Sequence, residues 1–141
     1  MEKMWSFKTK NFTVVWEIED DILDTMYMDK DMAAKCRKHV NSGNWRCFAS
    51  TISVRDNATG IALGEAFLGQ SIYKKPAEFR DHFGMNAKGH GSYFSDMVRE
   101  AIAQARKNFP AHQATLHKKA QALESVLSVR LRSTKAREDA I

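Results

Sequence analysis

The chain has 141 residues, of which 43% are hydrophobic and 10% aromatic, and this composition predicts one folded domain rather than an intrinsically disordered chain. The formal net charge of +5 permits contacts with polyanions but does not require them. No apolar run approaches the length of a membrane span, and the first residues lack the apolar stretch of a signal peptide. We therefore expect a cytoplasmic protein without a membrane partner, in which Cys36 and Cys47 are small buried residues rather than disulfide partners.

The first part of the chain predicts a strand hairpin. Residues 11–19 alternate apolar and polar side chains, which is the two-residue period of a strand. Asp20 and Asp21 are the expected turn, after which residues 22–28 could return as a second strand. The residues expected to point inward are Phe12, Val14, Trp16 and Ile18 in the first strand and Ile22, Met26 and Met28 in the second.

A helix is expected over residues 31–41, between this hairpin and a second one. Asp29 and Asp31 are suitable N-cap residues, and Gly43 is suited to follow the last turn. An apolar face recurs every four residues, at Met32, Cys36 and Val40.

The second hairpin is predicted by two apolar runs around a strong turn signal. Residues 45–55 are rich in β-branched and aromatic types, residues 56–60 contain the Asp, Asn and Gly that a tight turn needs, and residues 61–68 pair back. Gly64 and Gly69 predict a β-bulge or a close approach of another backbone.

The remainder of the chain predicts helices. A short helix is expected over 76–83, and after a loop at 84–92 a longer helix begins at Ser92 or Ser95. Its apolar residues repeat at three and four positions and are Phe94, Met97, Val98, Ala101, Ile102, Ala105 and Phe109. Pro110 is expected to interrupt it and to separate it from a last helix over about 111–135.

These elements together predict an α+β fold. It has an antiparallel sheet of about four strands with an inserted helix, followed by two C-terminal helices. We expect an α+β core domain over residues 1–109 and a basic C-terminal helix over 110–141 that serves as an interaction or oligomerisation element.

The C-terminal helix combines basic side chains with an apolar seam. Its candidate partner-binding residues are Lys118, Lys119, Arg130, Arg132, Lys135 and Arg137. The candidate oligomer seam is formed by Leu116, Leu123, Leu127 and Leu131, and Val126 widens it. The seam favours packing of this helix on the core domain or against a second copy of the chain in a homodimer. The basic residues could meet phosphates or form an ordinary solvated face, and without aromatic residues after Pro110 this helix is not expected to stack on bases.

The loop at 84–92 is a candidate anion site. Its glycine spacing fits a phosphate-binding loop, but His90 and Gly91 replace the Lys and Ser/Thr of that motif, and a helix precedes it instead of a strand, which excludes a nucleotide triphosphatase. Lys88 and His90 beside the backbone amides of Gly91 and Ser92, at a helix start, could still hold an anion. The alternative is a connection whose glycines only relieve strain.

No sequence pattern predicts catalysis or a cofactor. The five histidines and two cysteines lack the spacing of a metal site, and no nucleophile elbow is present, so we expect a protein that is not an enzyme and binds no metal. Glu17, Glu19, Asp20 and Asp21 gather near one strand end. They could be simply solvated, or form an acidic patch that meets a basic partner or this chain's own tail.

Four segments together resemble small uncharacterised proteins of bacteriophages, prophages and plasmids. They are Trp45-Arg-Cys-Phe-Ala-Ser, Leu63-Gly-Glu-Ala-Phe-Leu-Gly-Gln-Ser-Ile-Tyr73, Pro76-Ala-Glu-Phe-Arg-Asp-His-Phe83 and Gly91-Ser-Tyr-Phe-Ser-Asp-Met-Val-Arg-Glu-Ala-Ile102. The resemblance covers about residues 5–107 and carries no catalytic residue. It implies a phage or mobile-element accessory protein in the host cytoplasm, of the kind that antagonises host defences.

The expected function is therefore non-enzymatic binding and inhibition of a host defence complex, in the manner of an anti-CRISPR protein. The partner would be a host protein or a ribonucleoprotein complex. Two alternatives remain open: a nucleic-acid-binding accessory protein that uses the basic helix, and a sponge for a phosphate ligand, such as a signalling nucleotide, that uses the 84–92 loop.

Overall fold

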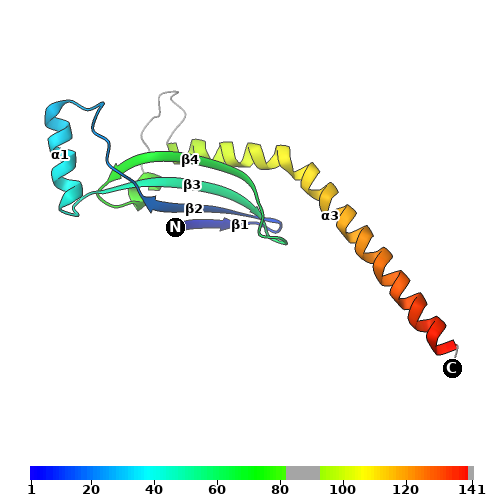
Figure 1. Cartoon of the computed structure of the whole chain (residues 1–141). Coiled ribbons are helices and arrows are strands. Elements are labelled where there is room, and N and C mark those ends of the chain that lie inside the picture. The colour runs from blue at the N-terminus through cyan, green and yellow to red at the C-terminus, as the bar shows by residue number, and fades with distance from the viewer. Residues whose placement is uncertain (82–92, 140–141) are drawn as a thin grey trace. The chain divides into compact units, whose positions relative to one another are not determined.

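The computed structural model describes the backbone of residues 1–81 and 93–139 and the side chains of residues 1–81 and 93–130 (Figure 1). The chain divides into two units, Met1–Arg106 and Lys107–Ile141. In chain order the elements are β1 (Glu2–Lys8), β2 (Phe12–Asp20), α1 (Lys30–Asn41), β3 (Arg46–Asp56), β4 (Ala62–Tyr73), α2 (Ala77–Asp81) and α3 (Tyr93–Asp139).

The four strands form one antiparallel sheet in the order β1-β2-β3-β4, which confirms the α+β class and the four-stranded sheet. The strand expected over residues 22–28 is wrong, because that segment leads to α1 without forming a strand and Ile22 and Met26 are exposed. The hairpin partner of β2 is instead the N-terminal strand β1. Thr9 closes that hairpin, since its backbone N–H donates to the carbonyl of Phe12 over 2.8 Å.

One face of the sheet carries the core. Trp16 lies opposite Ile52, and Ile52 lies opposite Ala66, so β2, β3 and β4 present apolar residues to the same side. Trp16 is buried, and its indole N–H donates to the Ser50 hydroxyl over 3.1 Å. Rings from α2 and α3 complete the core. Ring centroids of Phe79 and Phe94 lie 5.7 and 5.4 Å from that of Trp16.

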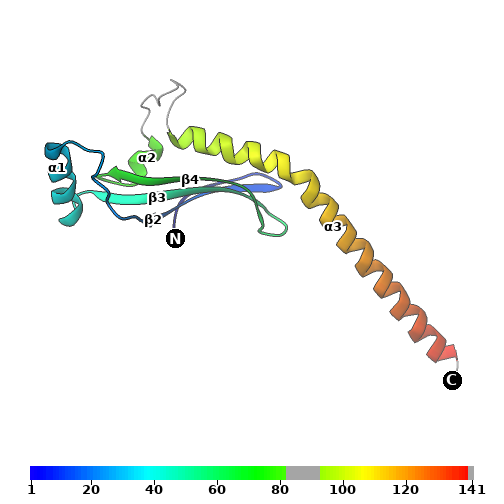
Figure 2. The same ribbon diagram turned by 45° about the horizontal axis from the view of Figure 1, so that its top comes forward.

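The first turns of α3 cover this face together with α2 (Figures 1 and 2). Of the side chains expected on the apolar stripe, Phe94, Met97, Ala101 and Ala105 are buried, and Val98 and Ile102 are half-buried. The helix backbone crosses β4 directly over Gly64, where a Cβ atom would overlap the Ala101 carbonyl oxygen and lie 2.7 Å from the Ala105 nitrogen. The close backbone approach expected at Gly64 is therefore confirmed.

The second expected irregularity of β4 is a bulge. The register of the β3–β4 pair advances by two residues in β3, from Phe48 to Ser50, and by three residues in β4, from Ser71 to Leu68. One extra residue of β4 is therefore accommodated near Gly69. Gln70 adopts a φ of +25° there, which a residue with a side chain rarely adopts. The bulge turns the Gln70 side chain toward the segment before α1.

Helix α1 begins as predicted but presents a different face. The Asp29 carboxylate accepts a hydrogen bond from the Met32 N–H over 2.7 Å, and Gly43 follows the helix with a φ of +81°. Ala33 and Cys36 are buried, whereas Met32, which we expected on the inner face, is 48% exposed. The buried face of α1 therefore begins at Ala33, one residue after Met32, where the four-residue repeat predicted that it would begin.

The expected break at Pro110 is wrong, because α3 continues through it from Tyr93 to Asp139. Proline lacks an N–H group and costs about 3 kcal/mol inside a helix. Alanine, glutamine and lysine on both sides favour the helix and offset that cost. The division between the two units falls after Arg106, whose carbonyl lacks the hydrogen bond that residue 110 would otherwise donate.

Candidate interaction surfaces

The helix of the second unit exposes its apolar seam. Leu123 is 60% exposed and Leu127 48%, and Val126 beside them is also exposed, while Leu116 is half-buried. The side chain of Leu131 lies outside the described residues. A single helix with an apolar stripe gains most of its stability in proteins by packing that stripe against another element. The described part of the seam is therefore a surface suited to a protein contact.

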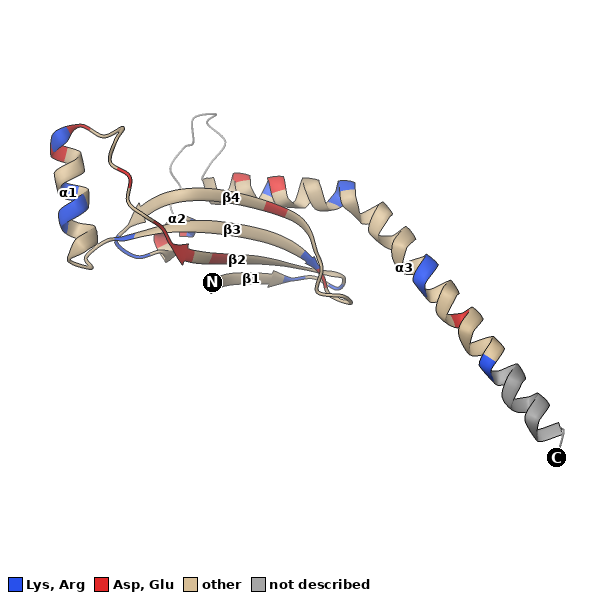
Figure 3. Cartoon of the chain, viewed as in Figure 1, with Lys and Arg blue, Asp and Glu red and all other residues tan. Residues whose placement is uncertain are grey.

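Basic side chains accompany this seam. Lys118, Lys119 and Arg130 are exposed, and Figure 3 shows basic residues along this part of α3. Glu124 is the acidic residue between them. The side chains of Arg132, Lys135 and Arg137 lie outside the described residues, although the backbone there is helical. The seam and the nearby charges give the helix a cationic, amphipathic character.

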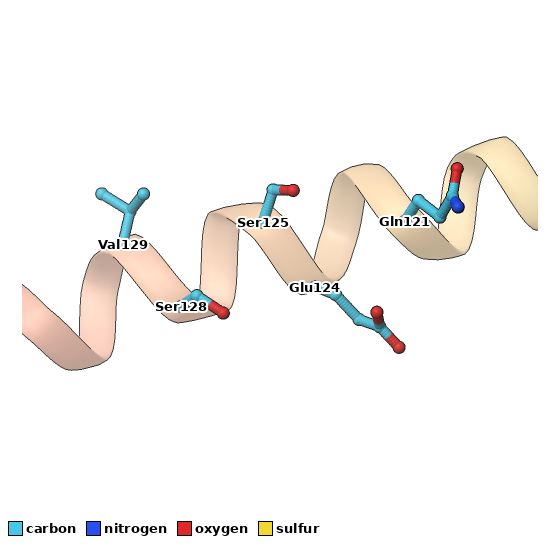
Figure 4. Close-up of a pocket in the computed structure, with 5 residues that line it drawn as sticks. All are labelled: Gln121, Glu124, Ser125, Ser128 and Val129. Carbon is cyan, nitrogen blue, oxygen red and sulfur yellow. The ribbon is translucent and has the colours of Figure 1, made fainter.

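The other side of the same helix is polar. A shallow open depression there is lined by Gln121, Glu124, Ser125, Ser128 and Val129 (Figure 4). These residues recur at three and four positions and come from one helix only, so they form an open surface rather than an enclosed ligand site. This side supplies positions at which a substitution leaves the seam intact.

A second candidate surface lies between β2 and α1, in the 19–32 segment. Hydrogen bonds to Gln70 of β4 fix its backbone: the Asp24 N–H donates to the Gln70 side-chain carbonyl over 2.6 Å, and the Gln70 amide donates back to the Asp24 carbonyl over 2.8 Å. The Asp21 carboxylate accepts from the backbone N–H groups of Ile22 and Gln70, each over 2.8 Å. Arg37 of α1 donates to the Thr25 hydroxyl over 3.0 Å.

This ordered segment displays large apolar side chains to solvent. Ile22 is 87% exposed, Met26 77% and Tyr27 93%, and Met32 follows in the first turn of α1. Our sequence interpretation missed this surface because it placed Ile22 and Met26 on the inner face of a strand and Met32 on the inner face of a helix. The signal that could have identified it is the density of aspartates in the segment, since Asp disfavours strands and favours turns and helix caps.

The 19–32 segment is also acidic (Figure 3). Its acidic residues are Glu19, Asp20, Asp21, Asp24, Asp29 and Asp31, and its basic residue is Lys30. Arg46 of β3 pairs with Asp20 and with Glu2, each over 2.9 Å, and the hydrogen bond to Asp20 is the largest cause of the raised pKa of Arg46. The remaining carboxylates give the segment a negative field.

Cys47 of β3 lies behind this segment. Its backbone carbonyl accepts from the Asp21 N–H over 3.1 Å, and burial, followed by the nearby Asp21 and Cys36, raises the pKa of the Cys47 thiol. Both cysteines are buried and unpaired, as expected.

His39 stacks on Trp45 at 4.3 Å between ring centroids. Within residues 1–81 and 93–130, no group of three or more His, Cys, Asp or Glu side chains could hold a metal ion.

The candidate anion site cannot be placed in the same way. Lys88, His90, Gly91 and Ser92 lie outside the described residues, so their predicted role stays a prediction. In the described part of the chain, no helix is long and apolar enough to cross a membrane.

Comparisons with known proteins add no relative to these observations. No protein-family model matches the chain, and searches of curated proteins and of solved structures found no match.

Proposed function

We propose that the chain is a non-enzymatic binding protein that self-associates through the apolar seam of its C-terminal helix and acts by occupying the surface of a host complex. The observation that supports this most is the exposure of Leu123 and Leu127 on one side of that helix. Burying the exposed half of each side chain would contribute about 1 kcal/mol, and the neighbouring seam residues would add to this. Such a stripe favours a protein contact over permanent exposure to water.

The finer proposal is a phage or mobile-element protein that antagonises a host defence complex, in the manner of an anti-CRISPR protein. Its support is the sequence resemblance over residues 5–107 together with two exposed surfaces of opposite charge. A protein that blocks a ribonucleoprotein needs shape and charge complementary to that partner, and it needs no catalytic group. The absence of enzymatic activity remains part of the proposal.

The proposal is tested with purified CRISPR effector complexes and restriction enzymes, by measuring target-DNA binding and cleavage with and without the full chain. We expect one of these activities to fall in the presence of the wild-type chain. The double substitution Leu123→Gln and Leu127→Gln should remove the effect, because glutamine keeps the helix propensity and loses the apolar contact. Ser125→Gln with Ser128→Gln, on the polar side, is the matched control and should inhibit like the wild type. Unchanged activities throughout would contradict the finer proposal.

The exposed Lys118, Lys119 and Arg130 favour a second candidate, direct binding to nucleic acid through phosphate contacts. This candidate predicts affinity that falls steeply with salt, and replacing Lys118 and Lys119 by glutamate should lower the slope of log affinity against log salt by about 2. An affinity that does not change with salt concentration, or no binding to DNA or RNA, would exclude direct nucleic-acid binding. The phosphate-ligand sponge depends on residues 84–92 and is tested by ligand retention after Lys88→Ala and His90→Ala.

A further inference from the structure

We infer that the 19–32 segment is the docking surface for the C-terminal helix of a second copy of this chain. This inference rests on the proposed self-association and names the surface that the apolar seam contacts. In a dimer with twofold symmetry, the C-terminal helix of each copy would pack on the 19–32 segment of the other copy, and the two contacts would be equivalent.

The segment is ordered in the way a binding surface needs. Two hydrogen bonds of the Gln70 side chain hold the Asp24 backbone, and Arg37 holds Thr25, without using any of the apolar side chains. Ile22, Met26 and Tyr27 are therefore presented on a fixed backbone while remaining among the most exposed large side chains of the described residues. Binding to a preorganised surface loses less conformational freedom than binding to a disordered one.

The residue types fit a helix as the occupant. Methionine adapts to irregular apolar surfaces, and tyrosine supplies large contact area at low entropy cost. The helix offers a matching element, because Leu116, Leu123 and Leu127 follow one side at helical spacing. An amphipathic helix laid on a partly apolar surface is a common recognition mode.

The helix could pack on the 19–32 segment of a second copy or on the apolar seam of that copy, and charge distinguishes these two partners. From Lys107 to Arg130 the helix has Glu124 as its acid and four basic residues, Lys107, Lys118, Lys119 and Arg130. Seam-to-seam pairing would bring two such helices together, and like charges at an interface are repulsive. The 19–32 segment has six acids against one base, and with Arg37 and Arg46, which contact Thr25 and Asp20, the balance is still three negative charges, so the same helix meets opposite charge there. Complementarity therefore favours the segment over the seam.

The inference is tested by sedimentation equilibrium of the full chain, which gives the dimer dissociation constant. Met26→Ser with Tyr27→Ser removes exposed apolar surface and no described hydrogen bond, so the fold should survive. We expect association to weaken at least about tenfold, as hot-spot substitutions do. Leu123→Gln with Leu127→Gln should weaken it as strongly. Phe67→Ser, which removes an exposed ring from β4, is the control and should leave the constant unchanged.

A charge exchange adds a readout that misfolding cannot imitate. Asp31→Lys and the pair Lys118→Glu and Lys119→Glu should each weaken association, and their combination in one chain should restore much of it.

If the Met26/Tyr27 variant associates like the wild type while the Leu123/Leu127 variant is monomeric, the helix pairs with the same helix of the second copy. That result would contradict this inference and leave self-association standing. A monomeric wild-type chain would overturn both. A monomer that loses host binding with the Met26/Tyr27 variant would assign the segment to the host partner, which also overturns the inference.

Discussion

Replacing Gly64 by alanine should destabilise the core more than any other single-methyl addition to the sheet. The new Cβ would overlap the carbonyl oxygen of Ala101 and lie 2.7 Å from the backbone nitrogen of Ala105. Both obstacles are backbone atoms of α3, so no rotamer change relieves the overlap, and the helix must move away from the sheet by about 1 Å to reach contact distance. That movement loosens the packing of Phe94 and Met97 against the core.

The expected cost is about 3 kcal/mol, at the upper end of what overpacking a core usually costs. For a folded unit of this size that corresponds to a fall in Tm of more than about 10 °C, measured by circular dichroism or calorimetry. Gly69→Ala is the matched control in the same strand, because its Cβ would meet nothing closer than 3.6 Å. It should change Tm little. Equal Tm values for the two variants would refute the close packing of α3 on β4.

Three further predictions concern the core and the 19–32 segment. Ser50→Ala removes the acceptor of the buried Trp16 indole N–H and should cost about 1–3 kcal/mol in urea unfolding, whereas a cost near zero would contradict that hydrogen bond. Burial raises the pKa of Cys47, so as pH rises above the ordinary value of 9.0 the thiol ionises in the unfolded chain before it ionises in the folded chain. The free energy of unfolding should therefore fall as pH rises above that value, and it should fall less in Cys47→Ala. Gln70→Ala removes two hydrogen bonds to Asp24, and amide hydrogen exchange at residues 22–26 should quicken while that of β3 does not change.

Most of the sheet could be predicted from the sequence because its signals are local. The alternation through Trp16 and the turn at 56–60 fix β2, β3 and the start of β4 without reference to anything distant. Gly64 was identifiable as the place of a bulge or of a close backbone approach because a glycine inside a strand usually marks one of the two. The α+β class follows from these elements together.

The errors come from features that depend on tertiary context. Residues 22–28 have the apolar content of a strand, but the first strand pairs with β2 and leaves them outside the sheet. Two of their hydrogen bonds, both at Asp24, come from the side chain of Gln70, far along the chain, which no local pattern reveals. The sequence predicts a break at Pro110 because the local cost of proline in a helix is large, yet the helix-favouring residues around it outweigh that cost.

The candidate surfaces were predictable to different degrees. The seam through Leu123 and Leu127 follows from helical spacing alone, and the structure adds that it is exposed. The surface formed by Ile22, Met26 and Tyr27 was not predicted, because the apolar residues of the segment favour a strand and outweighed its aspartates, which favour turns and helix caps. The acidic patch was noticed in the sequence, but its association with these apolar side chains needed the structure.

The mass of the full chain in solution, measured by light scattering over a range of concentrations, tests the central claim most directly. A single chain has a mass of 16.1 kDa. We predict that the wild type and the Ser125→Gln/Ser128→Gln control approach twice this mass as concentration rises, and that Leu123→Gln with Leu127→Gln stays at the mass of one chain. A wild-type chain that keeps the mass of one chain at every concentration, or a seam variant that dimerises as the wild type does, would contradict it.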